Sequence, residues 1–356
     1  MCSGYRCEFI MQEFLMCTAI SFSTKDHYFG RNLDLEYSYQ ESVTITPRNY
    51  PFIFRKTENM NSHYAMIGMA YVVEDYPLYY DAVNEKGLGM AGLSFEGNAC
   101  YYEEVPEKEN VSPFEFIPYI LGQCACVEDA EEVLLKINVM KEDFRSDLPL
   151  SPLHWMISDK EKSIVVETLS GGMRVYPNPT GVLTNNPPFR QQLFGLNNYM
   201  SLSKEMPVNS FSKNIPLKVY SKGMGAIGLP GDLSSVSRFV RAVFAKENSV
   251  CGKGEMESVG QFFHILGAVE QQKGLVHIVR EKENTWGSND VSLGENEDYE
   301  ITIYSSCCNS EKGIYYYKTY DNSQITAVDM YKENLDGQHV VSYPLLTGQQ
   351  VKWQNR

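Results

Sequence analysis

The sequence predicts an α+β domain whose helices and sheets form separate layers. Runs rich in β-branched and aromatic residues lie near both ends of the chain, and runs with helical spacing of apolar residues lie between them. Strands and helices therefore do not alternate as they do in a βαβ fold. Because the 356 residues contain no Pro/Gly/Ser-rich linker and no fixed-period repeat, we expect one domain.

Strands are predicted where β-branched and aromatic residues cluster beside turn-forming residues. The predicted strands cover residues 42–47, 63–73, 87–95, 163–169 and 300–306. Near the C-terminus, GIYYYKTY and SQITAVDM flank the turn-forming pair Asp321 and Asn322, and this pattern predicts a β-hairpin.

Helices are predicted between these strands. Residues 112–115 (SPFE) have the form of a capping box with proline at the first helical position, and Pro118 is expected to kink or shorten the helix that follows. The run VEDAEEVLLKI from Val127 places acidic residues in its first turn, near the positive end of the helix dipole.

Two longer helices are predicted from apolar residues at i, i+3 and i+4. One is SSVSRFVRAVFAK from Ser234, and the other is ESVGQFFHILGAVEQQKG from Glu257, for which Gly274 is the expected C-cap. The acidic, turn-rich residues 281–298 are expected to form an exposed loop.

The amino-acid composition indicates which partners and which location to expect. A formal net charge of -14 and a pI near 5.0 would repel nucleic acid and anionic membrane surfaces, so neither is an expected partner. The chain has no run of 18 apolar residues, and residues 1–15 lack the apolar core of a secretory signal, so we expect a cytoplasmic protein.

The nine cysteines have scattered spacings, which indicate reduced thiols rather than a disulfide framework. Cys124 with Cys126, and the adjacent Cys307 and Cys308, lack a partner at zinc-ligand spacing, so we expect no metal. No GxGxxG or Walker loop follows a predicted strand, so no nucleotide cofactor is expected either.

The segment from Cys17 to Asp34 combines a thiol, two predicted strands and a charged pair. The strand TAISFS, a turn at 24–26 and the strand HYFG form a predicted hairpin that returns Arg31 and Asp34 to Cys17. A neighbouring guanidinium favours the thiolate, which is the nucleophilic form of cysteine. The alternative is that Cys17 packs as a small apolar residue.

A cysteine nucleophile also needs a base. None of the six histidines lies in a recognisable catalytic motif, so structural or surface roles are expected for them. The other candidate base is the α-amine of Cys17, which exists only if the Met16–Cys17 bond is cut, and which titrates near pH ~8. Translation from Met16 followed by loss of that residue would expose the amine, and Asp34 could orient it.

Six sequence motifs follow one another along the chain. The motifs are MCTAISFSTKDHYFGRNLDLEYSYQESVTITPRNYP from Met16, YPLYYDAVNEKGLGMAGLSF from Tyr76, SPLHWMISD from Ser151, GVLTNNPPF from Gly181, IGLPGDLSSVSRFVR from Ile227 and SSCCNSEKGIYYYKTYDNSQITAVDMYKENLDG from Ser305. In this order they resemble the choloylglycine hydrolase family, and within it the bile salt hydrolases of Gram-positive gut bacteria. The resemblance runs from Met16 to about Pro344. It implies an N-terminal nucleophile hydrolase with a four-layer αββα sandwich, which hydrolyses the amide that joins a bile acid to glycine or taurine.

The resemblance also implies the roles of particular residues. Cys17 matches the nucleophile, and Arg31 and Asp34 match the pair that tunes and orients it. Asn185 in LTNNP matches the oxyanion donor, and Arg238 in SVSRF matches the remaining active-site arginine. Without the resemblance, Asn185 would be assigned to a turn and Arg238 to a solvated helix face.

One position departs from the family pattern. Bile salt hydrolases commonly have AGLNF where this chain has AGLSF, so Ser94 stands in place of an asparagine. The family uses the backbone N–H of this position in the oxyanion hole, and serine keeps that group. Penicillin V acylases resemble one another around a tyrosine here, so Ser94 assigns the chain to neither subfamily.

Apolar side chains are expected to bind the sterol skeleton, because it offers a large apolar area at about 25 cal/mol per Å² buried. Leu33 and the YPLYY segment with Tyr76, Tyr79 and Tyr80 match pocket-lining loops of the family, and loop 140–150 is expected to cover the site. The alternative is that these side chains belong to the ordinary core.

The leading hypothesis is a bile salt hydrolase that acts on substrates of the glycocholate and taurocholate type through a thioester on Cys17. Residues 1–16 are interpreted as an upstream extension, or else a propeptide, absent from a mature single domain of residues 17–356. The resemblance further implies a homotetramer. Two alternatives stay open: a penicillin V acylase, and a non-catalytic bile salt binder if the extension is retained.

Overall fold

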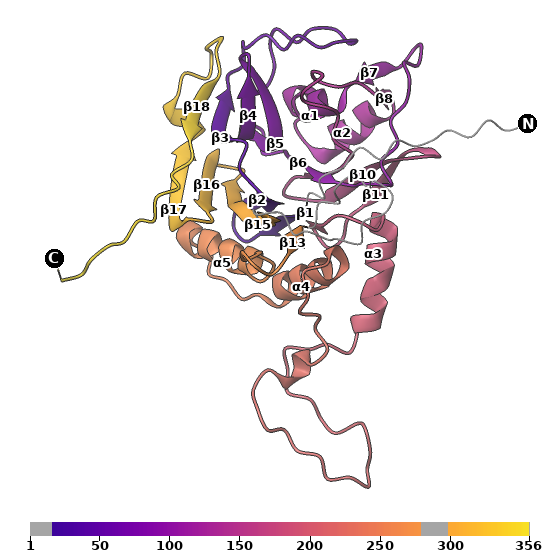
Figure 1. Ribbon diagram of the computed structural model, residues 1–356, viewed down its shortest axis with the longest axis vertical. Coiled ribbons are helices and arrows are strands. Elements are labelled where there is room, and N and C mark those ends of the chain that lie inside the picture. Colours follow the sequence, from indigo (N-terminus) through magenta and orange to yellow (C-terminus); the bar gives the residue numbers. More distant parts are fainter. Residues whose placement is uncertain (1–15, 279–297, 356) are drawn as a thin grey trace, which may run out of the picture.

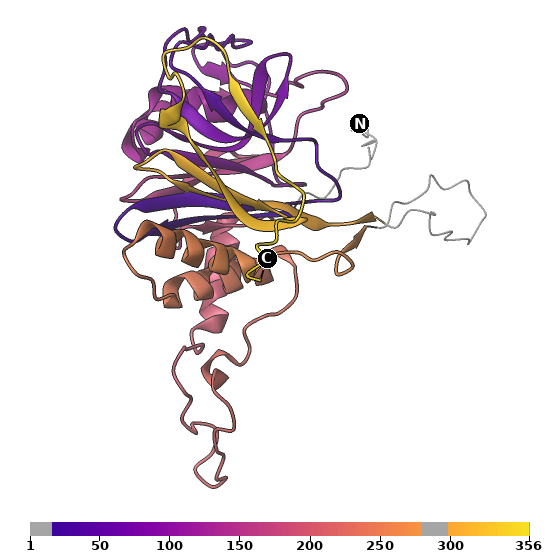
Figure 2. The same ribbon diagram turned by 90° about the vertical axis from the view of Figure 1, so that its left-hand side faces the viewer.

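The computed structural model describes residues 16–278 and 298–355, which form a four-layer αββα sandwich (Figure 1). Two antiparallel sheets lie face to face. Helices α1 (Phe116–Gln123) and α2 (Val127–Leu134) cover the outer face of one sheet, and α4 (Ser235–Asn248) and α5 (Glu255–Gly267) cover the outer face of the other (Figures 1 and 2). The layers implied by the family resemblance are confirmed.

The six-stranded sheet has the order β12-β1-β2-β15-β16-β17. Its strands are β12 (Val182–Leu183), β1 (Met16–Ser23), β2 (His27–Leu35), β15 (Ile301–Asn309), β16 (Ile314–Thr319) and β17 (Asn322–Asp329). Strands from the two ends of the sequence therefore pair at its centre. Strand β2 is buried at all nine positions, because both of its faces are covered.

The eight-stranded sheet has the order β11-β10-β9-β6-β5-β4-β3-β18. Its strands are β11 (Gly172–Pro177), β10 (Ser163–Leu169), β9 (Leu153–Ser158), β6 (Gly89–Ser94), β5 (Tyr76–Asn84), β4 (Met66–Val73), β3 (Ser42–Thr46) and β18 (Val341–Pro344). Neighbours in this sheet are antiparallel, so tight turns can join several of them.

Shorter elements complete the described residues. They are the parallel pair β7 (Glu109–Val111) and β8 (Ile137–Val139), the pair β13 (His277–Ile278) and β14 (Asp298–Tyr299), helix α3 (Phe189–Gly195), and the 3-10 helices η1 (Pro113–Glu115), η2 (Leu196–Tyr199), η3 (Met224–Ala226) and η4 (Met330–Lys332). Figure 2 shows the segment between α3 and α4 extending away from the sandwich.

Two clusters of buried side chains match the layers. One includes Cys17, Met156 and Phe262, and it joins the two sheets to α4 and α5. The other includes Phe116 and Trp155, and it lies between the eight-stranded sheet and helices α1 and α2. Each sheet is thus packed on both faces, as the layer arrangement requires.

Most predicted strands are confirmed. The five predicted runs form β3, β4, β6, β10 and β15, and the predicted C-terminal hairpin forms β16 and β17. The sequence does not predict β5 or β9. Strand β5 contains Pro77, Asp81 and Asn84, residue types that are depleted in strands, and its tertiary packing overrides that preference.

The helix that follows Ser112 begins as predicted. The Glu115 carboxylate accepts a hydrogen bond from the Ser112 backbone N–H at 3.1 Å, which is half of the predicted capping box. The first turn is the 3-10 helix η1, and α1 continues from it through Pro118 for eight residues. The predicted helices from Val127 and Ser234 are confirmed as α2 and α4.

The expected C-cap at Gly274 is wrong, because α5 ends at Gly267. Beyond that point Gln271 leaves the helix and bonds to the six-stranded sheet. Its backbone N–H donates to Thr302 Oγ1 at 2.8 Å, and its side-chain Nε2 donates to Asp34 at 3.3 Å. Tertiary hydrogen bonds therefore end the helix before the glycine.

Three further observations concern the chain as a whole. None of the described helices is long and apolar enough to cross a membrane. The seven described cysteines are free thiols. The predicted exposed loop 281–298 lies outside the described residues except at its last position.

Candidate active site

The hairpin of β1 and β2 places Arg31 and Asp34 beside Cys17, as predicted. Cys17 lies opposite Leu33, and Ala19 lies opposite Arg31. Because alternate residues of a strand share a face, Cys17 and Arg31 project toward the eight-stranded sheet, whereas Asp34 projects toward the helices. The thiol and the Asp34 carboxylate thus lie on opposite faces of one hairpin.

The Cys17 side chain is buried, and burial raises the pKa of its thiol above the ordinary value. Arg31 and Arg238 act in the opposite direction, and so does a hydrogen bond from the backbone of Asp34, while the Asp34 carboxylate opposes ionisation. The predicted effect of Arg31 on the thiolate is present. In the chain that retains Met16, burial outweighs it.

Arg31 is held rigidly behind the thiol. Its Nη1 donates to the backbone carbonyls of Tyr80 at 2.9 Å and Gly92 at 2.5 Å. Burial disfavours the charged form of Arg31. Nearby groups that can be negative outweigh this effect and raise the pKa of Arg31 above its ordinary value; the first is Cys17, and Asp81 is among the others. The guanidinium therefore stays charged and fixed next to the sulfur.

Asp34 is fully buried on the helix side of the hairpin. It accepts hydrogen bonds from Thr302 Oγ1 at 2.5 Å and from Gln271 Nε2 at 3.3 Å. Burial raises the pKa of Asp34 to about 6, although Arg238 and Thr302 favour its charged form. These contacts fix the position of the Asp34 carboxylate. In the pairing of β1 with β2, Asp34 lies opposite Met16, the residue before Cys17.

A second buried carboxyl, Glu300, lies next to Asp34. Burial and the charge of Asp34 raise the pKa of Glu300 to about 8, and its Oε1 accepts the backbone N–H of Met16 at 3.1 Å. No motif in the sequence points to this residue. Glu300 and Met16 are 284 residues apart, so no local signal relates them.

Asn185 lies directly opposite Cys17. The short strand β12 pairs Leu183 with Ala19, and two residues further along the same register Asn185 follows the end of β12. Beyond the end of β12, the Asn185 side chain provides the hydrogen-bond acceptor for β1, because its Oδ1 accepts the Cys17 N–H at 2.9 Å. The predicted nucleophile and the predicted oxyanion donor are therefore in contact.

Arg238 completes this group from helix α4. Its Nη1 donates to the Cys17 carbonyl at 2.5 Å and to Thr18 Oγ1 at 2.7 Å, and its Nη2 donates to Asn185 Oδ1 at 2.7 Å. It is fully buried rather than solvated. Since both neighbours of Asn185 Oδ1 are donors, this atom must be the amide oxygen, and Nδ2 must point the other way.

Nδ2 of Asn185 donates to the Ser94 carbonyl at 2.9 Å. Ser94 is the last residue of β6, where it pairs with Leu153 of β9. The structure thus brings Ser94 to Asn185 through its carbonyl. The part that the Ser94 backbone N–H plays in an oxyanion hole stays a prediction.

The four predicted substrate-binding side chains separate into two groups. Leu33 and Tyr80 belong to, or pack against, the buried cluster that contains Cys17. Tyr76 and Tyr79 belong to the other cluster, on the far face of the eight-stranded sheet. In loop 140–150, Phe144 packs on Tyr76 with ring centroids 5.7 Å apart. Substrate binding by these residues stays a prediction.

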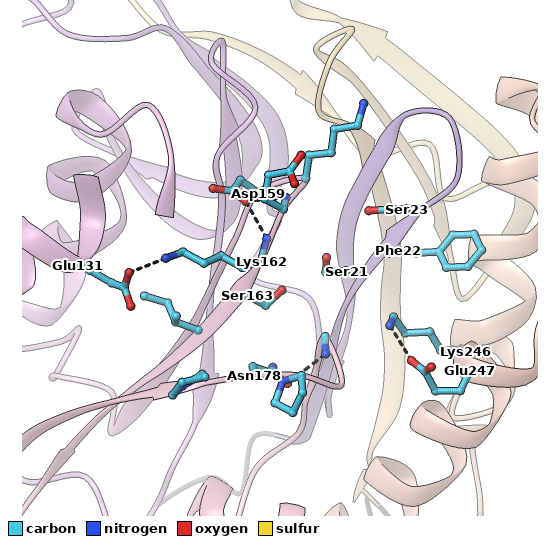
Figure 3. A pocket seen from close by; sticks show the side chains of 16 residues that line it. Ser21, Phe22, Ser23, Glu131, Asp159, Lys162, Ser163, Asn178, Lys246 and Glu247 are labelled. Carbon is cyan, nitrogen blue, oxygen red and sulfur yellow. Dashed lines mark hydrogen bonds and ion pairs between the residues drawn. The ribbon is translucent and has the colours of Figure 1, made fainter. Parts of the chain in front are cut away.

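A cavity of about 570 Å³ lies at the far end of β1, where Ser21 and Ser23 line it (Figure 3). Ser21 is four residues from Cys17, a distance of roughly 13 Å along a strand. The lysines that line it are ion-paired, Lys162 with Glu131 at 2.7 Å and Lys246 with Glu247 at 3.0 Å among them. We therefore assign the candidate active site to Cys17 and not to this cavity.

Within the part of the chain that the structure describes, no group of three or more His, Cys, Asp or Glu side chains is arranged to hold a metal ion. The candidate site instead combines a thiol, two arginines, a carboxylate and a side-chain amide around one backbone nitrogen. This set can stabilise a thiolate and an oxyanion, and it can orient an amine.

Known proteins resemble this chain over most of its length. The family model for linear amide C–N hydrolases of the choloylglycine hydrolase family matches residues 17–343. The chain is 54% identical over 330 residues to the bile salt hydrolase/transferase of Lactiplantibacillus plantarum, which covers 93% of this chain and 97% of that protein. It is 37% identical over 333 residues to the bile salt hydrolase/transferase of Clostridium perfringens, covering 92% and 96% respectively.

Solved structures show the same fold. A mutant of the conjugated bile acid hydrolase from Clostridium perfringens superposes with a TM-score of 0.83 at 36% identity, covering 96% of this chain and 100% of that chain. Penicillin V acylase from Agrobacterium tumefaciens superposes with a TM-score of 0.66 at 20% identity, covering 92% and 90%. The second likeness concerns the fold alone.

Proposed function

Because the chain belongs to the choloylglycine hydrolase family of linear amide C–N hydrolases, we propose that it cleaves the amide bond of bile salts conjugated to glycine or taurine. The relatives with that activity in their names match more than nine tenths of this chain. In this proposal residues 17–356 are the catalytic domain, and residues 1–16 are absent from the mature enzyme.

Cys17 is the nucleophile in this proposal. After removal of Met16, its α-amine takes the thiol proton, and the sulfur attacks the amide carbonyl carbon. The C–N bond then breaks, glycine or taurine leaves with the proton, and the bile acid remains as a thioester on Cys17. Water, deprotonated by the α-amine, cleaves the thioester and restores the thiol.

The contact between Asn185 and the Cys17 nitrogen carries this proposal. At 2.9 Å, Oδ1 can accept from that nitrogen as an amide or as an amine. Arg238 and Ser94 hold the two ends of the Asn185 amide, and such a preorganised amide is suited to stabilise an oxyanion. Loss of one oxyanion donor typically costs about 2.7 to 4 kcal/mol in the transition state.

The N-terminus of the active protein tests the choice of base. Intact mass and N-terminal sequencing are expected to show a chain that begins at Cys17. The variant Cys17→Ala is expected to lose hydrolysis, whereas Cys251→Ala, at a free thiol elsewhere in the chain, keeps it. An active protein that retains Met16 contradicts the α-amine as base. A protein that retains the extension and binds bile salt without cleaving it supports the non-catalytic alternative.

Substrate preference is tested by comparing glycocholate, taurocholate and penicillin V at equal concentrations. We expect faster turnover of at least one bile salt than of penicillin V. Turnover of penicillin V faster than of both bile salts contradicts the proposal and supports the acylase alternative.

We also propose that the active enzyme is a homo-oligomer, and specifically the homotetramer implied by the resemblance. The support is the segment between η2 and α4, which extends from the sandwich (Figure 2) and exposes large apolar side chains. Val208, Phe211 and Tyr220 are each more than four-fifths exposed, at 85%, 83% and 83%. Large exposed apolar side chains concentrated in one segment favour an interaction surface.

A further inference from the structure

We propose that His154 and Glu167 form a positioning pair that fixes Asn185 and Ser94 relative to each other. This inference rests on the proposed function, in which Asn185 donates to the oxyanion. Both side chains are fully buried, His154 on β9 and Glu167 on the neighbouring strand β10. The sequence alone predicts only a structural or surface role for this histidine.

His154 contacts both segments that carry the predicted oxyanion residues. Its Nε2 lies 2.8 Å from the carbonyl of Thr184, the residue before Asn185. Its ring stacks on Phe95, the residue after Ser94, with centroids 4.3 Å apart and planes 7° from parallel. The His154 ring thus contacts the residue before Asn185 and the residue after Ser94. The Asn185 amide and the Ser94 carbonyl are themselves hydrogen-bonded to each other.

Both ring nitrogens of His154 have a buried partner. A carbonyl oxygen only accepts, so Nε2 donates to the Thr184 carbonyl. The other ring nitrogen, Nδ1, lies 3.3 Å from Glu167 Oε1. Breaking such a buried pair by removing one partner is costly, because the other is left uncompensated.

Glu167 extends the contact to helix α3. Its Oε1 accepts the backbone N–H of Phe189, the first residue of α3, at 2.8 Å. From the same helix, Gln192 donates to the carbonyls of Asn185 and of Pro187 and accepts from the Thr184 hydroxyl. The pair and α3 therefore hold the chain from Thr184 to Phe189 at both ends.

The consequence for the reaction lies in the placement of one amide group. Asn185 is bonded to Cys17 and to Ser94 at 2.9 Å each, and its value as an oxyanion donor depends on its position to within a fraction of an ångström. His154 and Glu167 contact residues near Asn185 and Ser94 in the chain and do not contact the Asn185 amide itself. Both are therefore positioning residues. Their loss should slow the chemical step and leave substrate binding nearly unchanged.

The test uses the full chain with His154→Gln and Glu167→Gln, and Thr168→Val as the matched control. Thr168 is buried next to Glu167, and the described residues supply no hydrogen-bond partner for its hydroxyl. For each variant we measure kcat and KM on whichever of glycocholate, taurocholate and penicillin V the wild type hydrolyses. In parallel, mass spectrometry follows the alkylation rate of Cys17 by iodoacetamide.

We expect kcat to fall on the order of 10- to 100-fold in both variants, with KM changed less than about threefold. The alkylation rate should stay within about twofold of wild type, because that displacement reaction forms no oxyanion. Thr168→Val should match wild type in every measurement. If His154→Gln does not fold, Glu167→Gln decides, since a glutamine oxygen can still accept the Phe189 N–H.

A kcat equal to wild type, with or without a lower melting temperature, overturns the inference. A parallel fall in kcat and in alkylation also overturns it, because the pair would then act on the thiol or on the whole site. If the wild type cleaves penicillin V faster than either bile salt, the proposed substrate is wrong while the test of the pair proceeds on penicillin V. A wild-type chain that is inert toward all three substrates overturns both proposals.

Discussion

The Cys17 thiol experiences two opposing effects, because it is buried among apolar side chains and also lies next to a charged arginine. Burial disfavours the thiolate, whereas the fixed guanidinium of Arg31 and the backbone of Asp34 favour it. Removal of Met16 would add an ammonium group at the nitrogen that now bonds to Asn185. That charge would favour the thiolate further, so in the proposed mechanism the removal of Met16 would also activate the thiol.

Replacing Arg31 by methionine should raise the pKa of the Cys17 thiol, because it removes the principal charge that favours the thiolate. The measurement is the rate of Cys17 alkylation by iodoacetamide as a function of pH, followed by mass spectrometry. Arg145→Met, at an exposed arginine in loop 140–150, is the control and should leave the profile unchanged. Identical profiles for Arg31→Met and wild type would contradict this electrostatic account.

His27 at the far end of the hairpin is buried and neutral. Its Nε2 bonds to Ser21 and its Nδ1 to Ser310, each at 2.9 Å. Burial lowers the pKa of His27 from 6.5 to about 4, and the charges of Glu311 and Asp159 only partly offset this effect. The folded protein therefore resists protonation of this ring, whereas the unfolded chain does not.

The contribution of His27 to the free energy of unfolding should fall as pH drops from about 6.5 to about 4, because in that window the unfolded chain binds a proton at this residue and the folded chain does not. The raised pKa values of Asp34 and Glu300 act in the opposite direction, so the contribution of His27 is read from the difference between variants. The contribution is complete above pH 6.5, and its full loss amounts to about 3 kcal/mol. Urea unfolding across this range measures it. As pH falls through this range, the free energy of unfolding of wild type should decrease relative to that of His27→Gln, whereas His264→Gln, at an exposed histidine, should follow wild type. Equal slopes for all three proteins would rule His27 out as the source.

At the scale of elements, local pairs are predictable and distant pairs are not. The strands β1 and β2 are joined by three residues, so Arg31 and Asp34 follow from the sequence of one hairpin. Asn185 reaches Cys17 only because β12 lies at the edge of β1 and ends after two residues. Nothing in the sequence LTNNPPF indicates that register, which is why only the family resemblance pointed to Asn185.

The capping box at the start of α1 gives a prediction for stability. Glu115 accepts two backbone hydrogen bonds, from Ser112 at 3.1 Å and from Arg55 at 2.8 Å. Glu115→Ala leaves both N–H groups without this partner and should lower the free energy of unfolding by about 2 kcal/mol. Urea unfolding measures the loss, and kcat should be unchanged because α1 lies in the layer remote from Cys17.

Glu132→Ala, at an exposed position on α2, is the matched control for Glu115→Ala and should change stability by less than about 0.5 kcal/mol. If both variants lose the same stability, the hydrogen bonds of Glu115 are not the cause. If Glu115→Ala lowers kcat, the outer helix layer is coupled to the site in a way that these contacts do not explain.

At the scale of the whole molecule, the segment between η2 and α4 stands out because it buries little of its apolar surface in its own chain. Exposed apolar side chains scattered singly are common in proteins, and Leu135, the residue that follows α2, is such a case at 77% exposure. In the segment, by contrast, several occur within about 30 residues. In an oligomer, a second copy of the chain would cover these exposed apolar side chains.

The double variant Phe211→Ser with Tyr220→Ser should reduce the molar mass in solution toward that of one chain, because it removes apolar area that an oligomer would bury. Size-exclusion chromatography with light scattering measures the mass. Leu135→Ser is the control and should keep the wild-type mass. A monomeric wild type, or a double variant with unchanged mass, would contradict the role given to this segment.

The sequence by itself determined the layered α+β class, the β1–β2 hairpin and the family, because these depend on residue periodicity, short turns and motif order. Only the tertiary structure decided that the thiol is buried, that Asp34 is held by Gln271 and Thr302, and that His154 and Glu167 adjoin the Asn185 segment. Asn185 is 168 residues from Cys17. Contacts at such separations are set by sheet register and by packing between layers, and no local pattern encodes them.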